Sequence, residues 1–256
     1  LVSQDIFAKA DMEIGHSINL QNPLASEFEY MRRSLIPSLL MDLENNQGKV
    51  DMPIRIFELA NIYHHNEDNP KGLPEERPIL AFAIQGEDYR HAKGYLEALI
   101  NKLNLKEIRF SSIEEEGGCW QTNQTTQIYF GDQFIGVFGA IKTTVKENFN
   151  LKGGVVIANL DFKTISKLAN NNYSYLPISQ YPDIVEDITI ESNLKIGEII
   201  QLIKEDSRLV VSANYKTSLA NKHTFEIHLN HPEHNLTQEE ANKIKESLLP
   251  RLKQLE

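Results

Sequence analysis

Cysteine is nearly absent from this sequence, which has only Cys119 among its 256 residues. A single thiol excludes an internal disulfide framework and a zinc site built from several thiolates. Low cysteine use is also typical of a reducing compartment, so we expect a cytoplasmic protein.

Long apolar runs and an excess of positive charge are missing as well. No stretch approaches the ~18–20 apolar residues that span a bilayer, and residues 1–10 lack the basic, apolar and small-residue order of a signal peptide. We therefore expect no membrane partner. The net charge of −10 argues against a surface covered with phosphate-binding groups. Any nucleic-acid contact must come from a local patch.

Apolar residues make up 41% of the chain and charged residues 24%, as in ordinary globular proteins. The length leaves room for one large domain or two smaller ones, each with its own core. The chain starts at Leu1 rather than at methionine, so we expect a fragment of a longer protein.

The segment Asn22–Asn46 carries the strongest pattern near the start of the chain. Its apolar residues recur three or four positions apart, which is the spacing of one helix face; they are Phe28, Met31, Leu35, Leu39 and Leu43. Pro37 favours an extended run over Tyr30–Ile36, followed by a helix with this proline in its first turn that ends near residues 45–48.

The next part of the chain alternates between apolar strands and amphipathic helices. Ile14–Leu20 alternates like a strand, and Asn66–Pro78 is expected to be a surface loop. A hairpin turn is predicted at Gly131-Asp132, and Asp161 is expected to cap a helix over Asp161–Leu168. The other predicted elements are strands at Ile54–Leu59, Ile79–Ile84, Ile108–Phe110, Gln127–Phe130, Phe134–Phe138 and Val155–Leu160, and a helix over Ala92–Leu103.

An Asn-rich segment that ends at Pro177 marks a predicted domain boundary. The residues after it follow a strand–helix–strand–strand–helix order, with a connection at Lys216–Lys222 between the second and third strands. Thr237 and Glu240 form a capping box for the last helix, which Pro250 is expected to kink or end. This order is the split βαβ, ferredoxin-like pattern.

Two motifs in the first part carry a family resemblance. The run NPL at Asn22–Leu24, with Glu27 and MRRSLIPSLL at Met31–Leu40, resembles the NPLs-E-s-LRtSLlpgLL signature of the bacterial phenylalanyl-tRNA synthetase beta subunit. IFELANIY at Ile56–Tyr63 resembles the LFEiGrvF strand of that family, with Ala60 and Asn61 as departures. Two further matches lie at Lys93–Leu99 and Phe134–Gly139.

The resemblance continues to Glu256. Tyr181–Asp187 stands where the family has fPavrRD, with Glu186 in place of an arginine, and Asn221–Thr224 stands where it has GkkS. Asn235–Glu240 matches rtLtdeE. The resemblance implies an α+β chain from the C-terminal part of the beta subunit. It would comprise an inactive class II synthetase-like antiparallel sheet with flanking helices at 1–169, a linker at 170–176, and a ferredoxin-fold anticodon-binding-like domain at 177–256. The last strand of that fold is missing or not included.

The arginines that a class II active site needs are not where the family pattern would place them. Such a site clamps phosphates between arginines and magnesium. The strand that should lead into f-R-x-E ends in Ile62–Glu67, and Gly136–Ala140 lacks the arginine of G-x-G-x-E-R. We therefore expect no catalytic, metal or cofactor residue in this chain. The resemblance implies that ATP and Mg²⁺ serve the holoenzyme, a heterotetramer whose alpha subunit holds the aminoacylation site.

The resemblance also implies candidate contact residues. Those expected at the subunit interface or in the core are Asn22, Pro23, Glu27, Met31, Arg32, Leu35 and Leu39. Residues 177–256 contain 9 Lys+Arg against 13 Asp+Glu, which is unusual for an RNA-binding module. The residues that could still contact tRNA(Phe) are Tyr215, Lys216, Lys222 and His223. The alternatives are lysines scattered on a solvated face, and a non-catalytic RNA-binding or scaffold protein without synthetase activity.

Other polar groups are most simply read as solvated. His64 and His65 are adjacent on a strand and point to opposite faces, and the His231-x-x-His234 pair has no thiolate. Glu114–Glu116 and Gly117-Gly118 are expected to lie in exposed turns, without the lysine of a P-loop.

Overall fold

A computed structural model describes residues 1–256 apart from residues 16, 67, 69–71, 114–116, 171–178 and 254–256. The chain forms two compact units, Leu1–Tyr173 and Ser174–Glu256. The predicted linker at 170–176 lies outside the described residues except for Asn170, whose backbone N–H donates to the Leu103 carbonyl at 3.3 Å. None of the described helices is long and apolar enough to cross a bilayer.

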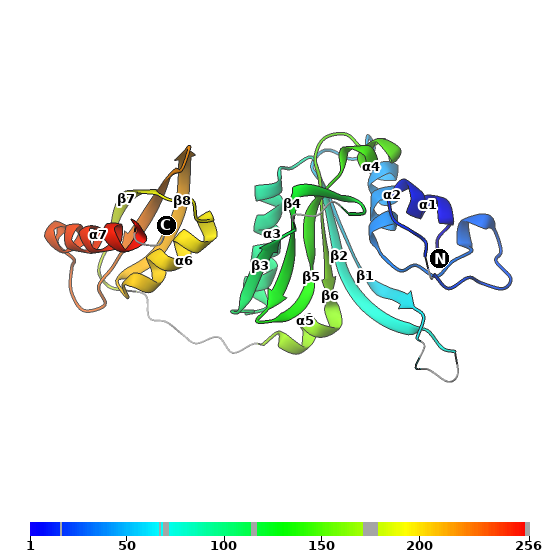
Figure 1. The fold of residues 1–256 in the computed structure, drawn as a ribbon, viewed down its shortest axis with the longest axis horizontal. Coiled ribbons are helices and arrows are strands. Elements are labelled where there is room, and N and C mark those ends of the chain that lie inside the picture. Colours follow the sequence, from blue (N-terminus) through cyan, green and yellow to red (C-terminus); the bar gives the residue numbers. More distant parts are fainter. Residues whose placement is uncertain (16, 67, 69–71, 114–116, 171–178, 254–256) are drawn as a thin grey trace. The chain divides into compact units, whose positions relative to one another are not determined.

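Unit 1 is a six-stranded antiparallel sheet with helices on both faces (Figure 1). The strand order is β1-β2-β6-β5-β4-β3, so the antiparallel sheet with flanking helices predicted from the sequence is confirmed. The strands are β1 (Ile54–His64), β2 (Glu75–Gln85), β3 (Ile108–Ser112), β4 (Trp120–Phe130), β5 (Gln133–Ile141) and β6 (Val155–Asp161). The helices are α1 (Gln4–Lys9), the short η1 (Ser26–Phe28), α2 (Ile36–Asn46), α3 (Tyr89–Lys102), α4 (Thr143–Asn148) and α5 (Phe162–Leu168).

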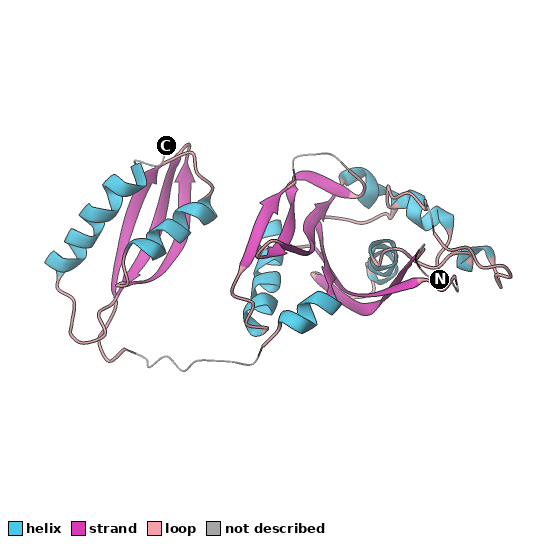
Figure 2. Cartoon of the chain, turned by 60° about the horizontal axis from the view of Figure 1, so that its bottom comes forward, coloured by secondary structure: helices cyan, strands magenta, loops and turns pink. Residues whose placement is uncertain are grey.

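Two cores lie on opposite faces of this sheet. Helices α1, α2 and α4 cover one face, and α3 and α5 cover the other (Figures 1 and 2). In α2, Leu35 at its start and Leu39, Leu40 and Leu43 within it are at most 1% exposed. Each such side chain contributes roughly 1.5–3 kcal/mol by leaving water, so this helix is a principal source of stability for unit 1.

The start of α2 differs from the prediction. The helix and its proline are confirmed, but the predicted extended run is wrong at its end, because Leu35 already has helical dihedral angles (φ −85°, ψ −16°). The Ser34 hydroxyl accepts from the Ile36 backbone N–H at 3.2 Å and so stabilises this tight entry. The strand predicted over Ile14–Leu20 is also wrong for its described residues, where Asn19 makes only an isolated bridge to Tyr30.

The predicted loop Asn66–Pro78 is too long. Residues 75–78 belong to β2 and pair with β1, where Pro78 lies opposite Asn61. Pairing of β2 with β6 begins one residue later, at Ile79. Pro78 therefore occupies a position with a partner strand on one side only, where the missing N–H costs little. The Gly131-Asp132 hairpin turn and the Asp161 cap of α5 are confirmed.

Unit 2 is a three-stranded antiparallel sheet with order β7-β9-β8, and α6 and α7 pack on one face. The predicted element order is confirmed: β7 (Ile184–Glu191), α6 (Ile196–Asp206), β8 (Val210–Leu219), β9 (Lys222–Leu229) and α7 (Gln238–Lys253). The Thr237–Glu240 capping box is present. Helix α7 continues past Pro250, so the alternative in which this proline ends the helix is wrong. A kink at Pro250 stays a prediction.

The connection between β8 and β9 is shorter than predicted. It consists of Ala220 and Asn221, with Ala220 at φ 52°. Lys216 therefore lies inside β8 and Lys222 is the first residue of β9. Both predicted loop lysines are strand residues, so their direction follows the alternation of the strand.

Candidate functional site

Of the residues predicted at the subunit interface or in the core, two lie in the core and a third is half-buried. Leu35 and Leu39 are 0% and 1% exposed. Arg32 is half-buried and ties its segment to β1, because its Nη1 donates to Glu58 Oε1 at 2.6 Å and its Nε donates to the Asn61 carbonyl at 3.2 Å. These three side chains hold the segment in place.

Of the rest of the set, Glu27 lines a groove of about 560 Å³ between α1, η1 and α2. Phe28 and Met41 line the groove and remain 47% and 42% exposed. Acidic side chains, among them Asp5, Glu27 and Glu44, stand around these apolar groups. Of the remaining predicted residues, those exposed are Asn22, Pro23 and Glu27, and Met31 is half-buried.

The four residues predicted to meet RNA do not share one face. Tyr215 lies opposite Phe225 and packs against the core beneath the helices, with the two rings edge to face. His223 contacts the Ser218 hydroxyl at 2.6 Å and the Ser192 carbonyl at 3.2 Å. The two lysines point to the opposite, helix-free face, because successive strand residues alternate.

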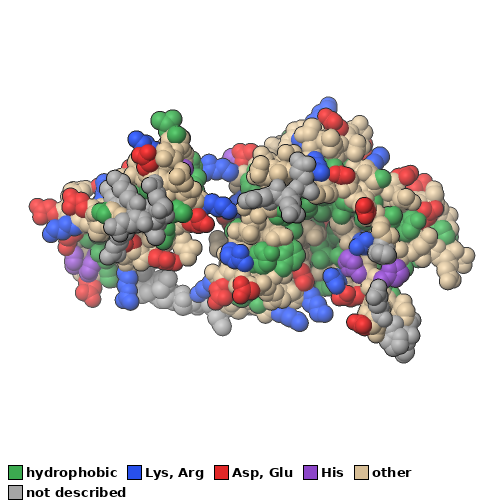
Figure 3. Space-filling view, in the orientation of Figure 1, with side chains coloured by type: hydrophobic (Ala, Val, Ile, Leu, Met, Phe, Trp, Pro, Cys, Tyr) green, Lys and Arg blue, Asp and Glu red, His purple; other side chains and the backbone are tan. Residues whose placement is uncertain are grey.

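Carboxylates already engage both lysines. Lys216 Nζ lies 2.9 Å from Asp187 Oδ2 and 3.4 Å from Glu226 Oε2, and Lys222 Nζ lies 3.7 Å from Glu191 Oε2. The hydrogen bond that Lys216 donates to Asp187 is the main cause of the raised pKa of Lys216. Figure 3 shows acidic and basic side chains interspersed on the described surface in view. On the helix-free face the carboxylates of Asp187, Glu191 and Glu226 lie beside the two lysines, so these lysines form no extended field of positive charge.

Other side chains stand where the family pattern would place phosphate-clamping arginines. The end of β1 presents His64, and burial, assisted by Arg77 and Arg33, lowers the pKa of this histidine, so it is neutral at pH 7. Arg77 donates to Glu75 at 2.7 Å. Arg32 is likewise held by Glu58, whereas Arg33 donates to the Ile14 backbone carbonyl at 3.4 Å.

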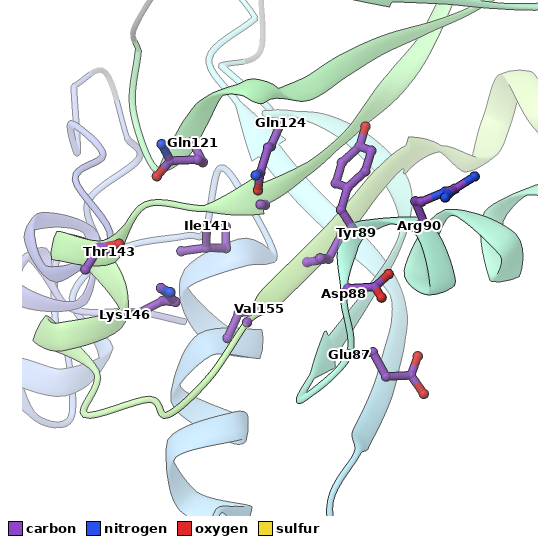
Figure 4. Close-up of a pocket in the computed structure, with 13 residues that line it drawn as sticks. Glu87, Asp88, Tyr89, Arg90, Gln121, Gln124, Ile141, Thr143, Lys146 and Val155 are labelled. Atoms are coloured by element: carbon purple, nitrogen blue, oxygen red, sulfur yellow. The ribbon is translucent and has the colours of Figure 1, made fainter. Parts of the chain in front are cut away.

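A polar cleft of about 580 Å³ opens at one end of the unit 1 sheet (Figure 4). Asp88 caps α3 by accepting from the His91 backbone N–H at 2.9 Å, which places Tyr89 and Arg90 at the rim. Gln121 and Gln124 come from β4, where regular pairing with β5 is interrupted between Trp120 and Thr125. Thr143 and Lys146 of α4 form the third wall, and the ends of β5 and β6 form the floor.

None of these cleft residues was identified from the sequence. They come from four segments that only the sheet pairing brings together. The available signals were glycines: Gly86 and Gly153 both have positive φ angles, and the Gly86 N–H donates to the Gly154 carbonyl at 2.9 Å. Those glycines mark the tight turns beside the cleft.

The histidine and acidic clusters form no metal site among the described residues. His231 and His234 stack on each other with ring centroids 3.9 Å apart, which directs their ring nitrogens to nearby backbone groups. Cys119 is buried, and burial raises the pKa of its thiol to about 12. Glu114–Glu116 lie outside the described residues.

A family model and two related proteins all carry the name of the beta chain or beta subunit of phenylalanine–tRNA ligase. The family model described as "Phenylalanyl tRNA synthetase beta chain CLM domain" matches residues 1–162. A Clostridium tetani protein named phenylalanine–tRNA ligase beta subunit is 28% identical over 210 residues, which covers 79% of this chain. A protein of the same name from Clostridium acetobutylicum is 24% identical over 83% of this chain. Both matches are longer than unit 1 and so continue into unit 2.

The chain spans only about a quarter of these relatives, 26% and 27% of their lengths. Among solved structures, a pyrrolysyl tRNA synthetase from Desulfitobacterium hafniense superposes with a TM-score of 0.52 at 16% identity. That match covers 65% of this chain and 57% of the other. It shows a shared class II synthetase-like fold and nothing further.

Proposed function

The chain belongs to the phenylalanyl tRNA synthetase beta chain CLM domain family, and we propose that it is a non-catalytic part of a phenylalanine–tRNA ligase. In this proposal it supports an alpha subunit that carries out aminoacylation. One observation carries the proposal: the sheet has a synthetase-like fold, yet Arg32 and Arg77 near the expected clamp are held by carboxylates.

The available side chains do not suit ATP and magnesium. Amino-acid activation needs cations aimed at phosphate oxygens. Arg32 and Arg77 are already paired with Glu58 and Glu75, and His64 is neutral. We therefore assign ATP and Mg²⁺ to the alpha subunit of the holoenzyme.

The groove beside η1 and α2 is the proposed contact for the alpha subunit. Phe28 and Met41 supply exposed apolar surface, and Leu24 in the adjoining NPL motif is 100% exposed. Apolar side chains in a groove are the usual anchors of a stable interface. The acidic groups around it favour a partner segment that carries lysine or arginine beside its apolar anchors.

Unit 2 is proposed to be the ferredoxin-fold domain of this family and to contact tRNA(Phe). Its strand order β7-β9-β8 and its element order agree with the split βαβ pattern through the fifth element, α7. In that pattern a further strand would lie beside β7. The proposed RNA contacts are Lys216 and Lys222, whose carboxylate partners would have to give way to phosphate.

The test is to purify the chain with and without a phenylalanine–tRNA ligase alpha subunit. We expect co-elution of the two proteins, and no phenylalanine-dependent ATP–pyrophosphate exchange by the chain alone. Exchange by the chain alone at a synthetase-like rate would overturn the non-catalytic assignment. Failure to bind any alpha subunit would favour the RNA-binding or scaffold alternative.

A pair of variants locates the interface. Phe28→Glu with Met41→Glu places two charges in the groove, and neither of the replaced side chains is buried. We therefore expect at least a tenfold loss of alpha-subunit affinity at unchanged thermal stability. Leu219→Glu is the control, because Leu219 is 81% exposed and lies in unit 2. Equal effects of the two changes would exclude the groove as the contact.

A further inference from the structure

The polar cleft at the start of α3 has features of a ligand site that the proposed function does not use. Its volume of about 580 Å³ lies in the range of natural small-molecule sites. Buried apolar groups back it, since Ile141 and Val155 are 2% and 1% exposed. The walls come from α3, β4 and α4 (Figure 4).

The charged groups of the cleft have local partners. Glu87 Oε1 accepts from Arg55 and from the Tyr95 hydroxyl, whereas Glu87 Oε2 is buried with no hydrogen-bond partner among the described residues. Asp88 is occupied by His91, and Lys146 Nζ donates to the Gly153 carbonyl at 3.2 Å. Arg90 points away from the cleft in Figure 4. Apart from Glu87 Oε2, which can accept a hydrogen bond from a ligand donor, these charged groups do not face a bound molecule as free charges.

Neutral groups remain available inside the cleft. The side-chain amides of Gln121 and Gln124 and the hydroxyls of Thr143 and Tyr89 form no hydrogen bond within the described part of the chain. Figure 4 shows the Tyr89 ring standing between Gln124 and Arg90 at the opening. Phe138 supports this ring at a centroid distance of 5.1 Å, and burial raises the pKa of Tyr89 to about 12, so its hydroxyl stays protonated.

Two amides beside an aromatic ring suit a flat partner with both donors and acceptors on its edge. Glutamine amides pair with the edges of nucleobases, and an aromatic ring stacks on their faces. We propose that this cleft binds a nucleobase, with Gln121 and Gln124 on the base edge and Tyr89 on the base face. The base can belong to a free nucleotide or to an unpaired position of an RNA, and the two sources are separated below.

The binding experiment uses the whole chain. AMP, GMP, CMP and UMP are titrated one at a time, followed by a single-stranded 12-nucleotide RNA and a fully paired RNA hairpin, with maltose as a neutral polar probe. Trp120 is the only tryptophan and directly precedes Gln121, so its fluorescence reports on the cleft; calorimetry provides a second readout. The proposal is independent of the alpha subunit, so the result stands whether or not that subunit binds.

The variants are Gln121→Ala with Gln124→Ala, and separately Tyr89→Leu, which removes the stacking ring and keeps an apolar side chain beside Phe138. Gln21→Ala is the control, since Gln21 is an exposed glutamine elsewhere in unit 1. We expect the double variant to weaken binding at least tenfold, Tyr89→Leu to weaken it severalfold, and the control to bind as the parent does.

The possible results distinguish a free-nucleotide site, an RNA site and the absence of a nucleobase site. Binding of a mononucleotide that the variants weaken supports a free-nucleotide site, and binding of only the single-stranded RNA with the same sensitivity supports an RNA site. No binding at millimolar concentration, binding of maltose in preference to nucleotides, or nucleotide binding that the variants leave unchanged would overturn the proposal.

Discussion

Glu186 replaces an arginine of the family pattern, and its surroundings explain how unit 2 accommodates the change. Lys245 Nζ donates to its Oε2 at 2.5 Å and Gln238 Nε2 donates to its Oε1 at 2.6 Å. The Glu186 and Lys245 side chains are 19% and 25% exposed. One partner lies on β7 and two lie on α7, so the reversed charge ties the helix to the sheet.

Replacing the Glu186 carboxylate tests how much its contacts with Lys245 and Gln238 stabilise unit 2. The hydrogen bond from Lys245, followed by that from Gln238, lowers the pKa of Glu186 in the folded chain. The pair therefore stabilises the fold above the ordinary glutamate pKa of about 4.3 and loses its effect as the pH falls below that value. We expect Glu186→Gln to cost about 0.5–1 kcal/mol near neutral pH and almost nothing in acid.

Hydrogen exchange of the α7 amides measures that difference within unit 2. Glu246→Gln is the matched control, because Glu246 is an exposed glutamate on the same helix. An equal loss from both changes, or a loss that persists at low pH, would show that the ion pair is not the cause.

The two lysines of the helix-free face provide a second test at the residue scale. If they meet tRNA, Lys216→Gln with Lys222→Gln should weaken binding and reduce the salt slope by roughly one for each lysine. The measurement is tRNA(Phe) affinity of the reconstituted ligase at two salt concentrations. Lys204→Gln, on exposed helix α6, controls for net charge. An unchanged slope would remove this face from the RNA contact.

At the scale of elements, the glycines of β5 have a packing role. A Cβ at Gly136 would lie 2.4 Å from the Asn159 carbonyl oxygen of β6, whereas a Cβ at Gly94 in α3 would meet nothing within 4 Å. A substitution at Gly136 therefore tests the close approach of two backbones, and a substitution at Gly94 tests helix propensity.

Alanine at each position should have opposite effects. Gly136→Ala forces backbone to move in a packed sheet and should destabilise unit 1 by about 1–3 kcal/mol. Gly94→Ala lies in an exposed helix interior and should stabilise it by up to about 1 kcal/mol. Urea unfolding followed by Trp120 fluorescence reports on unit 1 for both variants. Destabilisation by Gly94→Ala would contradict the packing argument.

Elements whose pattern is local could be predicted from the sequence. Helix α3, strand β6 and the Asp161 cap follow from spacing within a few residues. Strand ends were placed too early or too late, because pairing can extend a strand through polar residues and even through Pro78. Pairing partners lie far away in the sequence, and local pattern does not contain them.

The same reason limits prediction of the sites. The cleft joins residues near 90, 121 and 146, which no spacing rule connects. Tyr215 and Lys216 are neighbours in sequence, yet strand alternation sends them to opposite faces. The motif at Asn22–Leu40 could be identified from the sequence. Which of its residues are buried depends on the sheet beneath α2.

At the scale of the whole molecule, the two units have separate cores. Ile188, Ile203 and Phe225 belong to a cluster that contains unit 2 residues only, whereas the other two clusters contain unit 1 residues only. Cutting the chain between the units leaves each apolar cluster intact.

Limited proteolysis checks this independence. We expect the first cuts between Ala169 and Tyr175, and two fragments that remain resistant afterwards, because this Asn-rich sequence has few apolar residues and each unit keeps its own core. Mass spectrometry of a time course identifies the cut positions. First cuts inside either sheet, or unfolding of one fragment once it is released, would mean that the units depend on each other.

The edge of the unit 2 sheet has a consequence for behaviour in concentrated solution. Strand β7 ends that sheet, and none of the described residues pairs with its outer edge. An exposed edge can template another strand and begin aggregation. The three carboxylates of β7 are each paired with a lysine, Glu186 with Lys245, Asp187 with Lys216 and Glu191 with Lys222, so the strand presents little uncompensated charge to repel a second copy. Edge-to-edge pairing of β7 is therefore the route by which we expect copies of this chain to self-associate as the concentration rises.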